Sequence, residues 1–213
     1  MATGTVAQPA YNYSKLQKEQ LGRGVVAIRE NPLDVVVSWR YLSSDPINTS
    51  FNVYRNGEKI AEVPHSTGTF YRDTYSGNEK AVYTVKPVIN GVETGKLNGN
   101  YTLPANAPSG YIDIPLDRPA EGVTPSGQKY TYSPNDASIG DVDGDGEYEI
   151  ILKWDPSNAH DNAHDGYTGN VYFDCYRLTG EKLWRIDLGI MSVPEHIIPS
   201  LWCLIWMEMV KQK

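Results

Sequence analysis

The stretch SIGDVDGDGEYEIILKW, residues 138–154, decides the fold of the second half of the chain. Counted from Asp141, carboxylates stand at positions 1, 3, 5 and 9, and glycines stand at positions 4 and 6. Oxygen ligands at this spacing, with glycine at the sharp turn, are typical of a loop that wraps one Ca²⁺ ion. Residues 150–154 continue as a β-strand, so the exiting helix of an EF-hand has no place. The sequence predicts a calcium loop entering a strand, as in a blade of a calcium-binding β-propeller.

The expected calcium ligands all lie within this loop. They are the carboxylates of Asp141, Asp143, Asp145 and Glu149 and, by analogy with position 7 of other calcium loops, the backbone carbonyl of Glu147. The alternative is an acidic loop that is merely solvated. Five carboxylates within nine residues repel one another unless a cation is present, which favours the metal.

A second polar loop, residues 155–169, is too long for a simple turn. Its Asn158, Asp161 and Asp165 offer only oxygen ligands and form a weaker candidate for a second Ca²⁺ site. His160 and His164 would share one face of a helix and suggest zinc, but the surrounding Asn, Asp and Gly disfavour a helix and no Cys is near. Strands at 171–177 and 182–188 around a Thr179-Gly180 turn, with Trp184 and Leu188 inward, would complete one four-stranded blade.

The first half is predicted to be a small immunoglobulin-like or fibronectin type III-like β-sandwich. Runs rich in Val, Tyr, Thr and Phe are expected to form strands at residues 25–28, 35–42, 50–55, 69–73 and 81–89. Asn56-Gly57 and Asn90-Gly91 predict type I′ hairpin turns, and Trp39 and Tyr83 are expected in the core. His65, Arg72 and Asp73 are interpreted as solvated surface charges. Residues 102–108 are predicted to be a linker.

Composition excludes several classes of partner. The 213 residues carry 19 Lys and Arg against 26 Asp and Glu, a net charge of −7, which argues against nucleic acid. No run of about 18 uncharged apolar residues exists, because residues 190–207 are interrupted by prolines, Glu195 and His196, so no membrane span is predicted. Residues 7–10, Ala-Gln-Pro-Ala, are typical of a region just after a removed signal peptide, which favours export.

Several motifs together resemble the bacterial rhamnogalacturonan lyases of polysaccharide lyase family 11. In the second half they are NDASIGDVDGDG (135–146), ILKWDPSN (151–158), DGYTG (165–169) and KLWR (182–185). In the first half they are RGVVA (23–27), SWR (38–40) and FNVYR (51–55), so the resemblance spans roughly residues 20–189. The acidic loop alone would be a weak signal, but the joined motifs are specific.

This resemblance implies a fold and a function. Family members combine a β-sandwich with an eight-bladed, calcium-rich propeller and cleave the rhamnose–galacturonate bond of pectin by β-elimination. Asn135 and Asp155 would correspond to the family's substrate contacts, whereas by themselves they read equally well as a turn cap and an Asx-Pro turn. The resemblance also implies a secreted or periplasmic bacterial protein, expected as a monomer, with no general base identified in this chain.

The resemblance stops after Gly189. Residues 202–211 show neither periodicity nor caps, and a frame starting one nucleotide earlier permits Asp-Leu-Asp-Gly-Asp-Gly at residues 204–210. We therefore expect residues 190–213 to be an out-of-frame tail.

These observations give a domain division and two functional readings. The expected parts are an N-terminal segment (1–22), a sandwich (23–104), the start of a propeller (105–189) and the tail (190–213). In the first reading the chain is the N-terminal fragment of a rhamnogalacturonan lyase and is inactive as written. In the second it is a calcium-stabilised carbohydrate-binding or adhesion module with integrin-like repeats.

Overall fold

The computed structural model describes residues 20–95, 98–160 and 164–190, and these residues form an all-β structure. The expectations for Asp161, for the N-terminal segment up to residue 19 and for the tail from residue 191 lie outside the described residues. The elements, in chain order, are β1 (Val26–Arg29), β2 (Asp34–Ser38), β3 (Ser50–Arg55), β4 (Glu58–Val63), the 3-10 turn η2 (His65–Thr67), β5 (Phe70–Thr74), β6 (Ala81–Ile89), β7 (Val92–Glu93), β8 (Gly99–Leu103), β9 (Gly122–Val123), β10 (Lys129–Tyr130), β11 (Tyr132–Gly140), β12 (Glu149–Pro156), β13 (Asn170–Arg177) and β14 (Lys182–Ile190).

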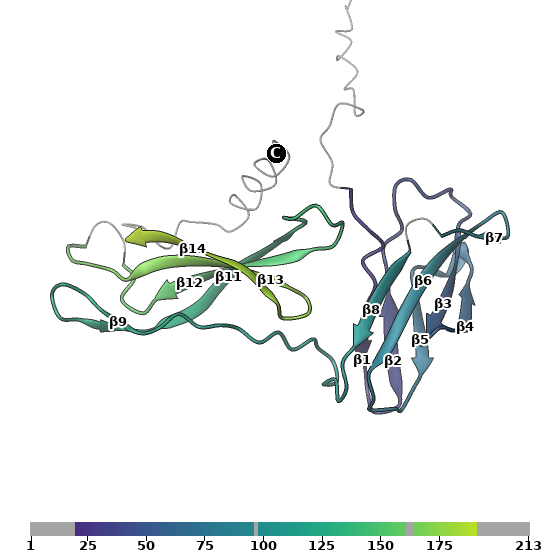
Figure 1. Cartoon of the computed structure of the whole chain (residues 1–213), viewed down its shortest axis with the longest axis horizontal. Helices are drawn as coiled ribbons and strands as arrows, with labels where there is room; N and C mark the ends of the chain where they lie inside the picture. Colours follow the sequence, from purple (N-terminus) through teal and green to yellow (C-terminus); the bar gives the residue numbers. More distant parts are fainter. Residues whose placement is uncertain (1–19, 96–97, 161–163, 191–213) are drawn as a thin grey trace, which may run out of the picture.

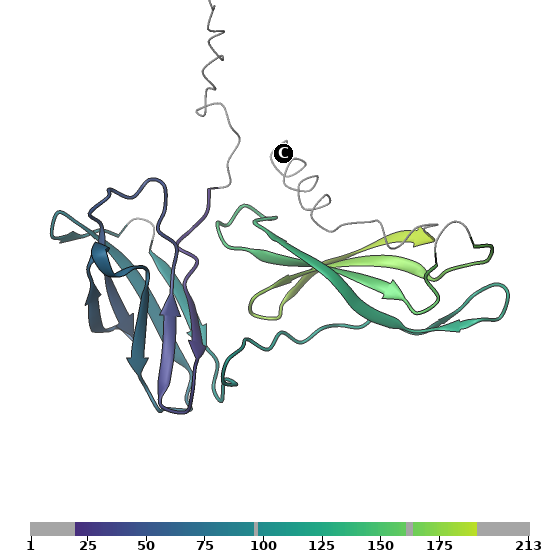
Figure 2. The same ribbon diagram turned by 180° about the vertical axis from the view of Figure 1, so that it is seen from behind.

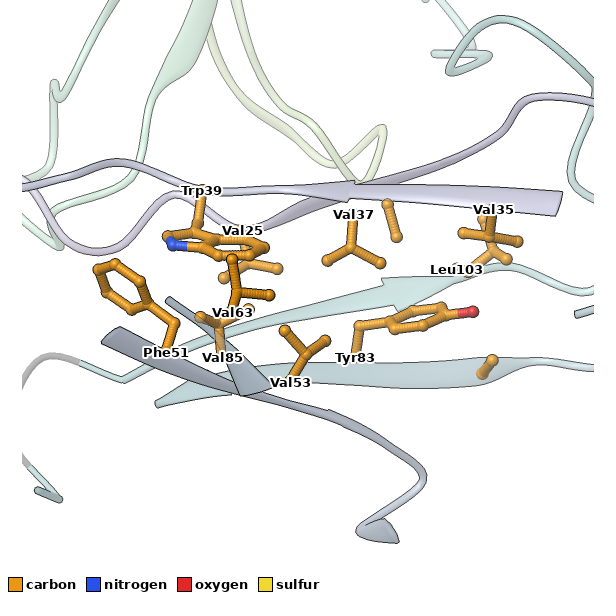
Figure 3. Packing of buried hydrophobic residues seen from close by; sticks show 12 residues of the cluster. Val25, Val35, Val37, Trp39, Phe51, Val53, Val63, Tyr83, Val85 and Leu103 are labelled. Atoms are coloured by element: carbon orange, nitrogen blue, oxygen red, sulfur yellow. The ribbon is translucent and has the colours of Figure 1, made fainter. Parts of the chain in front are cut away.

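The first region consists of two antiparallel sheets that share one core (Figures 1 and 2). One sheet has the order β1-β2-β5, and the other has the order β4-β3-β6-β7 with β8 also paired to β6. Alternate residues of both sheets point inward, because side chains along a strand alternate between its faces. Trp39 (5% exposed) and Tyr83 (fully buried) lie in this core, as predicted, and Trp39 packs edge-on against Phe51 (Figure 3).

The hairpin turns follow the Asn-Gly signals. Asn56 and Gly57 have φ angles of 50° and 85°, and Asn90 and Gly91 have φ angles of 51° and 78°. A type I′ turn needs positive φ at both central positions, which explains why these dipeptides close β3–β4 and β6–β7.

Two sequence interpretations in this region were wrong. Thr102 and Leu103 belong to β8 and pair with Val82 and Ala81 of β6, so the linker begins later than residue 102. Asp73 is 4% exposed, because its carboxylate accepts hydrogen bonds from Arg55 Nη1 at 2.6 Å and from the Tyr83 hydroxyl at 2.8 Å. Asp73 lies on β5, the edge strand of its sheet, and is buried because its partners Arg55 and Tyr83 come from β3 and β6 of the other sheet.

The second region is a four-stranded antiparallel sheet with the order β11-β12-β13-β14 (Figure 1). Each face carries its own small hydrophobic cluster, one around Ile151, Phe173 and Cys175 and the other around Leu152, Trp154 and Tyr176. Trp184 and Leu188 pack against the first cluster, as predicted. Within the described residues, no helix is long and apolar enough to cross a membrane.

Candidate metal centre and polar pair

The acidic loop between β11 and β12 is folded by its own carboxylates. Gly144 and Gly146 have φ angles of 80° and 90°, which a side chain would disfavour. The Asp141 carboxylate accepts hydrogen bonds from the Gly144 amide at 2.8 Å and from the Gly146 amide at 3.0 Å. The glycines at positions 4 and 6 therefore allow the turn that brings the later carboxylates back to Asp141.

Three of the predicted ligands meet in this loop. Carboxylate oxygens of Asp141, Asp143 and Glu149 lie within 4.8 Å of one another. Glu149 is 1% exposed and Asp141 is 8% exposed. A cluster of carboxylate oxygens at the surface is common without a metal, but two nearly buried carboxylates beside a third fit a hard cation such as Ca²⁺.

The pKa of Glu149 reflects its burial and the repulsion between the clustered carboxylates. Burial, together with repulsion from Asp143 and Asp145, raises the pKa of Glu149 to about 7, although the Val142 amide donates to its carboxylate at 3.0 Å. A bound cation would favour the ionised carboxylate instead, because an opposite charge nearby stabilises the charged form.

Asp145 is turned toward a neighbouring strand. Arg177 of β13 donates to Asp145 Oδ2 at 2.6 Å and also to Asp143. Burial opposes ionisation of Asp145, but the hydrogen bonds from Arg177 and from the Glu147 amide outweigh it and lower its pKa. Sequence analysis missed Arg177, although β12 and β13 place it directly opposite Glu149. Knowledge of the pairing register between β12 and β13 would have placed Arg177 beside the acidic loop.

Glu147 and its neighbours connect the loop to the sandwich. The Gly146 carbonyl accepts hydrogen bonds from the Gly22 amide at 2.5 Å and from Arg40 Nη1 at 3.1 Å. The Glu147 carboxylate accepts one from the Gly24 amide at 3.2 Å, and the Arg40 guanidinium lies 4.3 Å from the Tyr148 ring centre. The side chain of Glu147 is therefore used for packing the two regions together, and only its backbone carbonyl was predicted as a ligand.

The described part of the second loop does not bring its predicted ligands together. Asn158 is buried. Its side-chain amide donates to the Tyr167 carbonyl at 3.1 Å, and its side-chain oxygen accepts from the Gly169 amide at 3.0 Å, so Asn158 stabilises the loop conformation. Asp165 is exposed, and the His160 and His164 rings stand edge to face with centres 6.2 Å apart. Among the described residues, the acidic loop alone forms a cluster of three carboxylates or other ligand side chains.

Asn135 and Asp155, the predicted substrate contacts, form a hydrogen-bonded pair. The Asn135 side-chain amide donates to Asp155 Oδ2, and Lys153 Nζ lies 3.1 Å from Asp155 Oδ1. Asn135 is exposed and Asp155 is half-buried. Sequence analysis did not single out Lys153, although a lysine within the apolar run 150–154 was a visible signal. We call Asn135 and Asp155 the polar pair.

The polar pair and the acidic loop lie at opposite ends of the β11–β12 hairpin. Gly140 faces Glu149 at the loop end, and Ser133 faces Asp155 at the other. Asp155 lies six positions after Glu149 along β12, which corresponds to about 20 Å at roughly 3.3 Å per residue. One sugar residue cannot contact both sites.

Comparisons with known proteins match both regions. Residues 16–101 match the family described as rhamnogalacturonan I lyases beta-sheet domain, and residues 111–193 match rhamnogalacturonan lyase family 11, C-terminal domain. The chain belongs to rhamnogalacturonan lyase family 11. The first match ends within β8 and the second begins at residue 111, so each region matches a domain of rhamnogalacturonan lyases.

The chain spans less than a third of the length of three relatives that it matches. The chain is 50% identical over 175 residues to rhamnogalacturonan endolyase YesW of Bacillus subtilis and 48% identical to rhamnogalacturonan exolyase YesX of the same organism. These alignments cover 81% and 82% of this chain but 27% and 28% of the relatives. The crystal structure of YesW superposes with a TM-score of 0.70 over 81% of this chain and 28% of that one. A rhamnogalacturonan lyase structure from Bacillus licheniformis is 49% identical with a TM-score of 0.68, covering 81% of this chain and 29% of that one.

Proposed function

We propose that the described residues form part of a lyase that cleaves the rhamnose–galacturonate bond of rhamnogalacturonan by β-elimination. The observation that carries the proposal is the 50% identity to a rhamnogalacturonan endolyase, which extends through both regions. The polar pair supports it, because an exposed amide joined to a carboxylate offers donors and acceptors for sugar hydroxyls.

In this proposal the polar pair binds and orients the substrate. In β-elimination a base removes the C5 proton of galacturonate and a double bond forms between C4 and C5. The C4–O bond breaks, and the oxygen that leaves with rhamnose takes up a proton to become a hydroxyl group. Asn135 and Asp155 would hold hydroxyl groups of the polysaccharide near that centre, which lowers the barrier by positioning. The base is assigned to other parts of the lyase.

Calcium is the proposed metal, held by Asp141, Asp143 and Glu149. A Ca²⁺ ion placed against a uronate carboxylate neutralises it and makes the neighbouring C5 proton more acidic. The acidic loop lies about 20 Å along β12 from the polar pair at about 3.3 Å per residue, so we assign its ion to holding the loop and its contacts with the sandwich. A metal that acts on the substrate would have to lie elsewhere.

The proposal includes the architecture. We propose that the first region is a fibronectin type III-like domain, that the four-stranded sheet is the first blade of an eight-bladed propeller, and that the boundary lies near residue 104. We further propose export to the periplasm or medium, a monomer, and a frame change after Gly189. Resequencing the gene beyond the Gly189 codon tests the last of these.

The experiment that tests the function is an assay of unsaturated uronate. Purified protein is incubated with rhamnogalacturonan and Ca²⁺, and the absorbance of the C4–C5 double bond is followed. We expect no turnover by the 213-residue chain, because a propeller's active site is assembled from loops of several blades. We expect turnover by the product of the gene read in the restored frame. Release of unsaturated product by the 213-residue chain would contradict the assignment of the base to other blades, and inactivity of the restored product would contradict the function.

A further inference from the structure

The side chain of Lys153 on β12 is completely buried. Its ammonium contacts Asp155 Oδ1 at 3.1 Å, while Asp155 itself is 16% exposed at the side chain. Within the described part of the chain, neither Lys153 Nζ nor Asp155 Oδ1 makes a hydrogen bond of good geometry. A buried ammonium with unused donors is costly, so a buried lysine needs a reason.

Stability is a poor reason for this lysine. Replacing a buried ion pair by apolar residues of similar size is often neutral or stabilising. The neighbours of Lys153 on the same sheet face, Ile151 and Phe173, belong to an apolar cluster, which suits an unbranched apolar side chain such as methionine. The retained charge therefore points to its partner, the Asp155 carboxylate.

A β-bulge places Lys153 beneath the polar pair. Pro134 faces Trp154 and Ala137 faces Leu152, so two residues of β11, Asn135 and Asp136, stand opposite Lys153 alone. Bulges of this kind redirect side chains and are frequent beside active sites. Here the bulge turns the Asn135 amide toward Asp155 Oδ2, while Lys153 approaches the other oxygen, Oδ1.

We propose that Lys153 is a positioning residue for sugar binding, which holds the Asp155 carboxylate so that the polar pair faces the substrate. This inference rests on the proposed function. The ion-pair contact of the ammonium with Oδ1 and the hydrogen bond from the Asn135 amide to Oδ2 together restrict rotation of the carboxylate. The second amide proton and the carbonyl oxygen of the exposed Asn135 are then free to bind hydroxyl groups of the sugar. Lys153 does not touch the sugar.

The test compares Lys153→Met with Lys182→Met in the 213-residue chain labelled with ¹⁵N. Lys182 is a matched control, because it lies on the same sheet but is 31% exposed and pairs with Asp117. The first readout is the NMR signal of the Asn135 side-chain amide without sugar. We expect Lys153→Met to move this signal toward that of a free amide, and Lys182→Met to leave it unchanged. An unmoved signal in a folded Lys153→Met protein would overturn the proposal.

The second readout is the affinity for a rhamnogalacturonan oligosaccharide, followed through the same amide signal. We expect Lys153→Met to weaken binding about tenfold, which corresponds to about 1.4 kcal/mol, and Lys182→Met to leave it unchanged. Equal affinities for Lys153→Met and wild type would overturn the proposal. If the wild-type chain does not bind the sugar, the substrate contact in the proposed function fails, and the amide signal still decides whether Lys153 fixes the polar pair.

A third measurement applies if Lys153→Met does not fold. The ¹⁵Nζ signal of Lys153 is recorded in wild type and in Asp155→Asn. The proposal predicts that removing the carboxylate charge shifts this signal and speeds exchange of the ammonium protons. An unchanged signal would show that Lys153 does not hold Asp155.

Discussion

Buried carboxylates are paired differently in the sandwich and in the acidic loop of the four-stranded sheet. In the sandwich, buried Arg23 forms a two-pronged ion pair with Asp45, and buried Asp73 pairs with Arg55. In the sheet, the nearly buried Glu149 lies beside Asp141 and Asp143. The nearby cation, Arg177, pairs with Asp143 and Asp145 and not with Glu149. These buried carboxylates of the sandwich are thus paired with arginines. The sheet also pairs the buried Asp174 with Arg185, but its acidic loop gathers negative charge that favours a cation.

The hydrophobic cores of the two regions also differ. The sandwich buries one cluster that residues of both its sheets share (Figure 3). The four-stranded sheet divides its apolar residues into a small cluster on each face, and Tyr130 of the short β9–β10 sheet packs against one of them. We infer that the first region folds independently, whereas the second requires bound ions and packing against neighbouring structure to be stable.

The largest expected effect concerns independent folding. We expect a polypeptide of residues 20–104 to show a dispersed amide spectrum and a cooperative unfolding transition, because its core is closed. Residues 105–190 alone should show neither, because a single sheet needs packing on its faces for stability. Both polypeptides are measured under the same conditions with Ca²⁺. Cooperative unfolding of residues 105–190, or its absence in residues 20–104, would break the comparison.

The next effect is a pH dependence that arises from Glu149. In metal-free solution its pKa rises from the ordinary 4.5 to about 7 on folding. Between these values the folded state binds more protons than the unfolded state, so stability falls as pH rises and levels above pH 7. The expected loss is about 3 kcal/mol, measured by urea unfolding at pH 4.5 and pH 8 with a chelator.

Two controls sharpen this measurement. Glu149→Gln should remove most of the decline, because the amide does not titrate. Saturating Ca²⁺ should restore stability above pH 7, since the metal binds the ionised carboxylate. A wild-type stability that rises between pH 4.5 and pH 7 without metal would contradict the assigned environment of Glu149.

A smaller effect is expected from Arg177→Met. Arg177 competes with a metal for the oxygens of Asp143 and Asp145, so its removal should tighten Ca²⁺ binding by about tenfold, or about 1.4 kcal/mol. Arg72→Met is the control, because Arg72 is an exposed arginine that pairs with Glu30 on the sandwich. Weaker Ca²⁺ binding in Arg177→Met would show that the arginine supports the loop and does not compete with the ion.

Much of this comparison could be predicted from sequence where short-range chemistry decides the structure. The Asn-Gly turns, the core positions of Trp39 and Tyr83, and the glycine-dependent acidic loop follow from local φ requirements and strand alternation. The burial of Asp73 could not be predicted, because its partners Arg55 and Tyr83 come from other strands. The same holds for Lys153, whose meaning depends on a bulge in the partner strand β11. The surroundings of Asp73 and Lys153 therefore depend on how distant strands pair and pack, which local residue patterns do not reveal.

The proposed Ca²⁺ site of Asp141, Asp143 and Glu149 is measured by calorimetric titration of the 213-residue chain with Ca²⁺. We predict that wild type binds Ca²⁺ and that the double variant Asp143→Ala, Glu149→Gln loses one site. The matched double variant Glu30→Gln, Asp34→Asn, which alters two carboxylates near Arg72 on the sandwich, should retain it. The same number of sites in wild type and in the loop variant would contradict the claim.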